Sequence, residues 1–170
     1  MRASVRNILK QAQATSILVT HDQDEALSFA DSVAVMHSGT ILQVGTPIDV
    51  YTNPHSLTVS EFIGDANLIK GTATDKIVNT ELGHLNTTSD VEGPVIAVIR
   101  PENIRIGTDQ PNTLHLEVID QEFYGHDKII NLRLPSGLSI KARCSSTEEV
   151  EPGKNVPVHI ADAVQIFSAP

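Results

Sequence analysis

Residues 16–26, SILVTHDQDEA, decide how this sequence folds. The aliphatic run before His21 has no polar alternation, which is typical of a strand covered on both faces in a parallel sheet. Asp22, with Glu25 three residues later, forms a capping-box-like start to a helix. We therefore predict a strand over residues 15–20 that leads directly into His21. A side chain at that point is aimed out of the carboxyl end of the strand, where α/β folds place their ligands.

Helices are predicted on both sides of this strand. Upstream, Val5, Ile8 and Leu9 lie at helical spacing within residues 2–13. Downstream, the helix that begins at Asp22 carries an apolar stripe that we expect to be buried. The stripe consists of Ala26, Leu27, Phe29 and Ala30.

The next part of the sequence predicts a hairpin and two more helices. Ser38-Gly39 is a two-residue turn between two short apolar runs. Thr46 can cap a helix that has Pro47 at its first position, and Gly64 is suited to end a helix in a left-handed conformation. The predicted elements are strands at 32–37 and 40–44 and helices at 46–53 and 56–63.

After about Asn67 the pattern changes to short strands separated by Gly, Pro, Asn and Asp. Two alternating runs, 130–134 and 138–144, flank a Pro-Ser-Gly turn and predict a hairpin with one buried face. Further strands are predicted at 68–75, 94–99, 113–123, 156–160 and 163–167. This succession suggests a small barrel of the oligonucleotide/oligosaccharide-binding (OB) type, so that the fold class is α+β.

The composition is that of a globular chain with an acidic balance. At 170 residues it suits one domain or two small ones. Twelve Lys and Arg residues against 21 Asp and Glu residues give a net charge of −9. Because neutralisation of phosphates dominates nucleic-acid binding, this charge disfavours a nucleic-acid partner. The two Tyr and four Phe residues are also too few for a base-stacking platform.

Neither cysteines nor apolar runs indicate secretion or a membrane span. Cys144 is the single cysteine, which excludes an intrachain disulfide and fits a reducing compartment. No apolar run approaches the ~20 residues that a helix needs to cross a bilayer. Arg2, Arg6 and Lys10 interrupt the first residues, with no apolar stretch that would form a secretory signal. Any membrane contact is therefore expected to run through a partner.

Residues 17–54, ILVTHDQDEALSFADSVAVMHSGTILQVGTPIDVYTNP, closely resemble ATP-binding-cassette (ABC) importer ATPases from their switch histidine onward. The likeness continues through a short helix into EFIGDANLI. VIRPENIRI at 98–106 and EPGKNVPVHI at 151–160 resemble recurring segments of the TOBE domain, which follows the nucleotide-binding domain in these importers. QDEALSFAD and FIGDANLIKG are most similar to the ferric-iron branch, while the polyamine, sulfate and thiamine branches share much of the pattern.

The resemblance implies two domains: residues 1–66 are the end of a nucleotide-binding domain, and residues 67–170 are a TOBE-like β-domain. A P-loop, GxxxxGK[ST], would cradle the phosphates and hold Mg²⁺, but none occurs in the sequence. An LSGGQ-like signature and an acidic Walker B strand are missing too. We therefore expect the carboxyl-terminal part of an importer ATPase. ATP and Mg²⁺ would bind the parent protein, and this chain alone would bind neither and would be inactive.

The resemblance also implies partners and a location. A second copy of the subunit would be clamped against the first by ATP, and membrane permease subunits would receive the motion. The β-domain would serve dimerisation and regulation. The protein would be cytoplasmic and peripheral, held at the inner face of the cell membrane by the permease subunits.

His21 is the predicted catalytic and nucleotide-contacting residue. The resemblance implies that its side chain donates a hydrogen bond to the γ-phosphate of ATP and helps to hold the attacking water in line. The alternative is a histidine that merely ends a strand. Asp22 is expected to cap the next helix rather than act as an acid, and Asp24 and Glu25 are expected to form a solvated acidic turn.

No metal site is predicted. The remaining histidines show no H-x-x-x-H or Cys/His ligand spacing and are expected at the surface or in turns. They are His37, His55, His84, His115, His126 and His159. Cys144 lies on the apolar phase of its strand, which predicts a buried thiol rather than a reactive one.

Two polar groups of the β-region leave alternatives open. Tyr124-Gly125, with Asp127 and Lys128 beyond, forms either a small anion or regulator site or a plain corner in which glycine relieves strain. Arg100 and Arg105 either pair with acidic neighbours or bind a ligand. For the whole chain, the alternative hypothesis is a free-standing OB-like module that binds a small anion or a regulatory metabolite.

Overall fold

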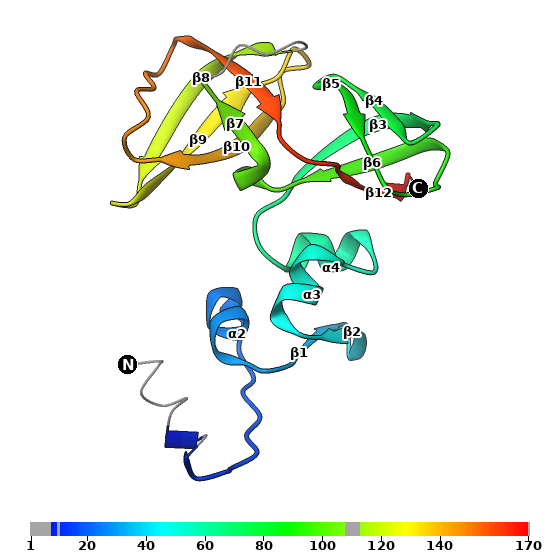
Figure 1. The fold of residues 1–170 in the computed structure, drawn as a ribbon, viewed down its shortest axis with the longest axis vertical. Coiled ribbons are helices and arrows are strands. Elements are labelled where there is room, and N and C mark those ends of the chain that lie inside the picture. Colours follow the sequence, from blue (N-terminus) through cyan, green and yellow to red (C-terminus); the bar gives the residue numbers. More distant parts are fainter. Residues whose placement is uncertain (1–7, 10, 108–112, 170) are drawn as a thin grey trace. The chain divides into compact units, whose positions relative to one another are not determined.

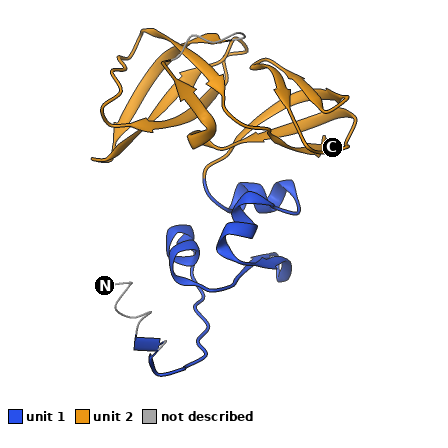
Figure 2. Cartoon of the chain, viewed as in Figure 1, with its two compact units in different colours: residues 1–64 blue, residues 65–170 orange. Residues whose placement is uncertain are grey.

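The computed structural model of this chain describes residues 8–9, 11–107 and 113–169. The chain divides into two compact units, Met1–Gly64 and Asp65–Pro170, hereafter unit 1 and unit 2 (Figure 2). Among the described residues, unit 1 contains short helices and one hairpin, whereas the regular structure of unit 2 consists of strands and one short 3-10 helix, Pro101–Asn103 (Figure 1). Most of the regular structure is therefore β.

Three helices of unit 1 begin at a side-chain cap. They are α2 (Gln23–Phe29), α3 (Pro47–Thr52) and α4 (Leu57–Phe62). Each cap oxygen accepts a hydrogen bond from a first-turn amide that the helix itself leaves unpaired. The pairs are Asp22 with Glu25, Thr46 with Asp49 and Ser56 with Val59, at 2.9, 3.2 and 3.3 Å. The caps predicted at Asp22 and Thr46 are confirmed.

The predicted hairpin of unit 1 is confirmed as well. Strands β1 (Val33–His37) and β2 (Thr40–Gly45) pair antiparallel around Ser38-Gly39. Both turn residues have positive φ, 48° and 77°, as a tight two-residue hairpin turn requires. A small core lies beside the hairpin and consists of Val33, Val35, Val50, Val59 and Ile63, with Leu27, Ala30, Leu42 and Tyr51 partly buried against it.

The strand predicted at 15–20 is wrong for this structure. Residues 14–20 have no regular secondary structure, and Ile17 and Val19 are 91% and 92% exposed. A parallel strand needs neighbours for its backbone groups and for both of its faces. In the part of unit 1 that the structure describes, the one sheet is the β1–β2 pair, and its strands bond to each other. His21 therefore follows an irregular, exposed segment.

Two other expectations for unit 1 are met only in part. Ile8, Leu9 and Gln11 are helical, but residues 1–7 and 10 of the predicted upstream helix lie outside the described residues. The apolar stripe of α2 is half-buried rather than buried. Leu27 and Ala30 pack against the core of unit 1, and no residue of α2 is fully enclosed.

Unit 2 contains two five-stranded sheets in which all pairings are antiparallel. The first has the order β10-β9-β8-β11-β7, and the second has the order β12-β6-β3-β4-β5. The strands of the first sheet are β7 (Ile104–Ile106), β8 (Leu114–Phe123), β9 (Asp127–Arg133), β10 (Ser139–Ser145) and β11 (Asn155–Ile160). Those of the second are β3 (Asn67–Thr74), β4 (Ile77–Thr80), β5 (Gly83–Asn86), β6 (Gly93–Ile99) and β12 (Gln165–Ser168).

All seven strands predicted for this region are present within a few residues of their expected bounds. They are divided between two sheets, however, where the sequence suggested one small barrel. The missed strands, β4, β5 and β7, are only four, four and three residues long. Such short runs show too little alternation to be told from loops.

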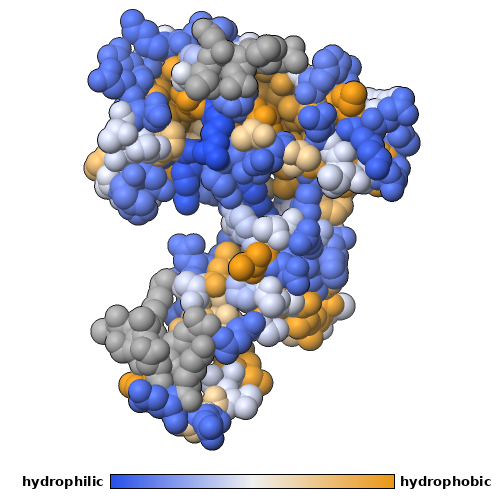
Figure 3. All heavy atoms as spheres, viewed as in Figure 1, coloured by the Kyte–Doolittle hydropathy of each residue, from blue (hydrophilic) through white to orange (hydrophobic). Residues whose placement is uncertain are grey.

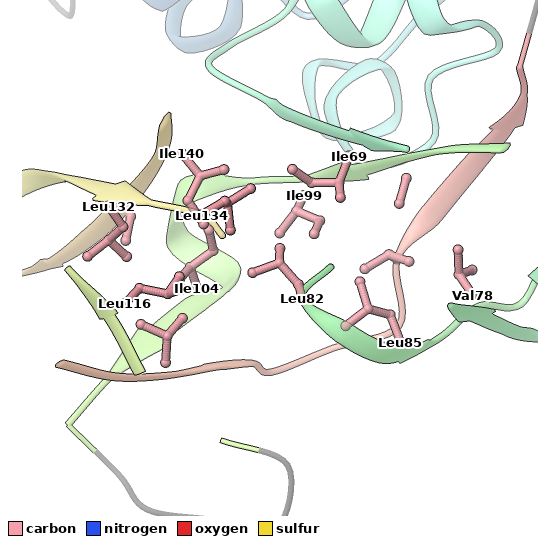
Figure 4. Close-up of a cluster of buried hydrophobic side chains, with 14 of the residues drawn as sticks. Ile69, Val78, Leu82, Leu85, Ile99, Ile104, Leu116, Leu132, Leu134 and Ile140 are labelled. Carbon is pink, nitrogen blue, oxygen red and sulfur yellow. The ribbon is translucent and has the colours of Figure 1, made fainter. Parts of the chain in front are cut away.

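A single hydrophobic core runs through both sheets (Figure 4). Ile69 and Ile99 of the second sheet belong to the same buried cluster as Leu132 and Ile140 of the first. Leu132 and Ile140 are paired across the β9–β10 hairpin and are both buried, which confirms the predicted hairpin with one buried face. Burial of these aliphatic faces holds the two sheets together as one unit.

Polar side chains also bridge the two sheets. Asn67 of β3 donates from Nδ2 to the carbonyl oxygens of Ile99, at 3.1 Å, and Lys141, at 2.8 Å. Its Oδ1 accepts from the Lys141 amide at 2.7 Å. The buried amide of Asn67 therefore pairs with the exposed edge of β10 as a neighbouring strand would. Glu81 likewise accepts from the backbone amide and hydroxyl of Ser136, at 3.2 and 3.0 Å.

Candidate functional site around the His21 turn

His21 lies in a turn whose backbone is held by hydrogen bonds on both sides. Thr20 Oγ1 accepts from the Asp22 amide at 3.0 Å, and Asp22 Oδ1 accepts from the Glu25 amide at 2.9 Å. The Asp22 carbonyl then accepts the first helical bond of α2 from Ala26, at 3.1 Å. The position of the His21 backbone is therefore defined locally, although the segment before it is irregular.

The His21 side chain is exposed. An imidazole at the surface can donate a hydrogen bond to an incoming anionic oxygen without first leaving a buried site. Asp22, beside it, is engaged as the cap of α2, which agrees with the predicted capping role.

A contact that the sequence did not predict ties this turn to the end of unit 1. Gln23, the first residue of α2, accepts from the Gly64 amide through Oε1 at 2.6 Å. Gly64 has φ +74°, which confirms the predicted left-handed helix end. A Cβ at Gly64 would lie 2.8 Å from the Tyr51 ring, so that only glycine fits here. The two partners are 41 residues apart, and no local pattern signals their contact.

The other histidines are not brought together. His37 stands edge-on to Phe62, with ring centroids 5.5 Å apart and an interplanar angle of 67°. His55 is fixed through its backbone, which donates to Gln43 Oε1 at 2.8 Å. Within residues 8–9, 11–107 and 113–169, no group of three or more His, Cys, Asp or Glu side chains is arranged to hold a metal ion.

In unit 2, the Tyr124-Gly125 motif forms a hairpin corner between β8 and β9. The Tyr124 amide donates to the Asp127 carbonyl at 2.9 Å, and Gly125 has φ +92°. The Tyr124 hydroxyl donates to Glu122 Oε2 at 2.7 Å. This hydrogen bond, together with the negative charge of Glu122, raises the pKa of Tyr124 above its ordinary value.

The charged residues next to this corner already have protein partners. Asp127 pairs with Arg143 at 3.4 Å and with His126 at 3.5 Å. Lys128 is buried, and its ammonium donates to the carbonyl of Glu148. These contacts favour the structural interpretation of the motif over an anion site.

The remaining polar candidates of unit 2 also have structural surroundings. Arg100 is 8% exposed and donates from Nη1 to the Asp65 carbonyl at 3.1 Å, whereas Arg105 is exposed. Cys144 is half-buried, and burial raises the pKa of its thiol, which makes it a poor nucleophile at neutral pH. The prediction of an unreactive thiol agrees with this environment.

A cavity of about 280 Å³ lies between residues 65–69 and 138–141 of unit 2. Lys141 lines it and pairs with Asp65 at 3.1 Å. Because the carboxylate of Asp65 offsets the positive charge of Lys141, this pair has no net positive charge to attract an anion.

The surface of both units exposes scattered hydrophobic side chains (Figure 3). In unit 1 these include Ile17, Leu18 and Val19, which lie directly before the His21 turn. In the described part of the chain, none of the helices is both long enough and apolar enough to span a bilayer.

Comparison with known protein families finds a match for residues 97–167, which contain β7 to β11 and most of β12. They match the TOBE domain family.

Similarity to curated proteins extends beyond the TOBE domain. The Fe(3+) ions import ATP-binding protein FbpC of Serratia marcescens is 35% identical over 170 residues, which are 98% of this chain and 49% of that protein. FbpC 2 of Rhodococcus jostii is 39% identical over 80% of this chain and 39% of its own length. The spermidine/putrescine import ATP-binding protein PotA of Borreliella afzelii is 42% identical over 62% of this chain and 32% of its own.

These relatives confirm the resemblance to ABC importer ATP-binding subunits. The chain spans about half the length of the curated relatives that match nearly all of it, such as the Serratia marcescens protein. Among solved structures, the molybdate-binding protein ModG superposes with a TM-score of 0.51 at 18% identity, covering 61% of this chain and 96% of ModG. At this identity the likeness shows the fold alone, and it supports an OB-like TOBE architecture.

Proposed function

We propose that this chain is the carboxyl-terminal part of the ATP-hydrolysing subunit of a prokaryotic ABC importer whose cargo is ferric iron. The observation that carries the proposal is similarity along nearly the whole chain to proteins named as Fe(3+) import ATP-binding proteins. A TOBE domain at residues 97–167 is consistent with it. Polyamines are the alternative cargo, because PotA proteins match at comparable identity over a shorter stretch.

In this proposal His21 donates a hydrogen bond to the γ-phosphate of ATP. Its exposed side chain and its fixed backbone suit a positioning role, in which charge on the transferring phosphoryl group is stabilised by a preplaced donor. A hydrogen bond to a charged group contributes about 1.5–3 kcal/mol. Loss of the imidazole should therefore slow hydrolysis roughly tenfold to 100-fold.

ATP and Mg²⁺ belong to the complete subunit rather than to this chain alone. Of the residues described, His21 is the one we assign to the nucleotide, and no metal-holding group of side chains accompanies it. ATP supplies the phosphoryl group when it is bound. This chain contributes a single donor to its outermost phosphate.

The exposed segment before His21 fits the same proposal. Ile17, Leu18 and Val19 are all exposed, although they belong to a run whose composition is typical of a buried parallel strand. We propose that residues 1–66 are the end of a nucleotide-binding domain. When the rest of that domain is present, residues 15–20 would pair as a strand. His21 would then stand at the carboxyl end of that strand.

Unit 2 is assigned to dimer contacts and regulation. In the complete transporter, two ATP-binding subunits would face each other and drive membrane permease subunits, which would hold the protein at the inner face of the cell membrane.

The decisive experiment compares two proteins, this 170-residue chain and a complete subunit obtained by extending the reading frame upstream. The complete subunit should contain a P-loop and hydrolyse ATP, and His21→Ala should reduce kcat at least tenfold. His55→Ala, at another exposed histidine of unit 1, should leave kcat unchanged. ATP turnover by the 170-residue chain that depends on His21, or equal effects of the two substitutions, would refute the proposal.

A further inference from the structure

The first turn of α2 and the last residue of unit 1 are joined by one hydrogen bond. Gln23 Oε1 accepts from the Gly64 amide at 2.6 Å. Leu27 and Ala30 anchor the later part of α2 on the core of unit 1. Gln23 therefore anchors the amino-terminal end of α2, which is the end nearest to His21.

The ring of Tyr51 lies close to Gly64. A Cβ built at Gly64 would come within 2.8 Å of Tyr51 Cε2, and the φ of +74° suits only glycine. The direction of the Gly64 amide is therefore set by packing within unit 1. Gln23 bonds to a fixed donor rather than to a loose chain end.

The next residue is anchored as firmly within unit 2. The carbonyl of Asp65 accepts from Arg100 Nη1 at 3.1 Å, and its carboxylate pairs with Lys141 Nζ at 3.1 Å. Gly64 and Asp65 are consecutive, so that one peptide bond links an anchor of unit 1 to an anchor of unit 2.

The route from Gln23 back to His21 is short. Asp22, between them, is fixed by its amide bond to Thr20 Oγ1 and by its cap bond to the Glu25 amide. The hydrogen bond between Gly64 and Gln23 is therefore a route by which a displacement of Gly64 would reach the first turn of α2. One residue, Asp22, separates His21 from that turn.

We propose that Gln23 is a positioning residue, which ties the His21 turn to the Gly64–Asp65 junction so that a change at this junction is felt at His21. The tie itself is a property of the 170-residue chain. Its consequence for ATP hydrolysis rests on the function proposed above for His21.

The test uses nuclear magnetic resonance on the full 170-residue chain. Gln23→Ala removes the acceptor, whereas Gln23→Glu keeps an oxygen in its place. We expect Gln23→Ala to speed hydrogen exchange of the Gly64 amide about two- to tenfold, as the loss of one net hydrogen bond implies, and to shift the His21 ring resonances. Gln23→Glu should restore slow exchange. Gln121→Ala, at an exposed glutamine of unit 2, should change neither signal.

A second substitution tests transmission from the junction. Lys141→Met removes the ion pair with Asp65 and keeps most of the apolar stem. We expect it to shift the His21 ring resonances in the wild-type background and to leave them unchanged in the Gln23→Ala background. Unchanged His21 resonances in the wild-type background, or equal shifts in both backgrounds, would overturn the proposal, as would unaltered Gly64 exchange in Gln23→Ala.

The same variants in the complete subunit separate this inference from the proposed function. If both hold, Gln23→Ala lowers kcat and leaves KM for ATP nearly unchanged, and Gln23→Glu recovers kcat. If the resonances respond as expected but His21→Ala leaves hydrolysis intact, the tie stands and the catalytic role of His21 fails.

Discussion

Unit 1 and unit 2 differ in how completely they bury their own apolar residues. Among the described residues, the buried cluster of unit 1 has five members, whereas that of unit 2 has 21 and extends through both sheets. Unit 1 also leaves Ile17 and Val19 more than 90% exposed, whereas the most exposed large hydrophobic side chain described in unit 2 is Phe123, at 71%. Unit 2 therefore closes its own core, while unit 1 presents surfaces that suit burial against further structure.

The difference matches the role proposed for each unit. A unit with its own core, such as unit 2, can fold as a module. A segment that reads as a buried strand but lies exposed is what a part of a larger sheet shows when its neighbours are not beside it.

A matched pair of Leu→Ala substitutions is expected to show the largest difference between the two units. Leu132 of β9 is fully buried, and its truncation should lower the free energy of unfolding of unit 2 by about 2–5 kcal/mol. Leu27 of α2 is half-buried, and its truncation should lower that of unit 1 by only about 1 kcal/mol. Urea denaturation followed by tyrosine fluorescence measures both, with the Leu27 variant made in a Tyr124→Phe background so that Tyr51 reports on unit 1, and the Leu132 variant made in a Tyr51→Phe background so that Tyr124 reports on unit 2. A larger loss from Leu27→Ala would mean that unit 1 is the better closed of the two.

A smaller effect is expected at the polar bridge of unit 2. Asn67→Ala removes three hydrogen bonds, one to the backbone of Ile99 and two to the backbone of Lys141. These backbone groups then lack their side-chain partner. We expect a loss of about 1–3 kcal/mol in the unfolding free energy of unit 2, measured by urea denaturation. Asn79→Ala, at an exposed asparagine of β4, should stay within about 0.5 kcal/mol of wild type. Equal losses in the two variants would show that the bridge adds nothing to the shared core.

The least effect on stability is expected at the Tyr124 corner. The raised pKa of Tyr124 means that its neutral form is favoured in the folded chain. The associated stability is complete below the unfolded pKa of 10.0 and is lost as the pH rises through the folded value. Glu122→Gln should lower the pKa of Tyr124 in an ultraviolet absorbance titration and leave that of Tyr51 unchanged. A Tyr124 pKa that is insensitive to this substitution would contradict the assigned cause.

Local signals were sufficient for much of the fold. The caps at Asp22 and Thr46 and the glycine end at Gly64 follow from residue chemistry within one turn of a helix. The β9–β10 hairpin follows from strict alternation on both sides of a glycine turn. These features depend on residues that are close in sequence, so the sequence alone is sufficient to predict them.

Features that depend on distant partners could not be predicted in this way. Asn67 bonds to Lys141 across 74 residues, and Gln23 bonds to Gly64 across 41. The division of the strands into two sheets depends on such long-range pairings as well. Residues 15–20 show the converse. Their apolar pattern indicates burial but does not identify the chain segment that would pack against them.

The most direct test of the account is amide hydrogen exchange of residues 15–20, measured in the 170-residue chain and in the complete subunit. We predict fast exchange in the 170-residue chain, where this segment is irregular and exposed. In the complete subunit, we predict protection comparable with that of β9, because the segment would be a paired strand that ends at His21. Slow exchange in the 170-residue chain, or fast exchange in the complete subunit, would contradict the account.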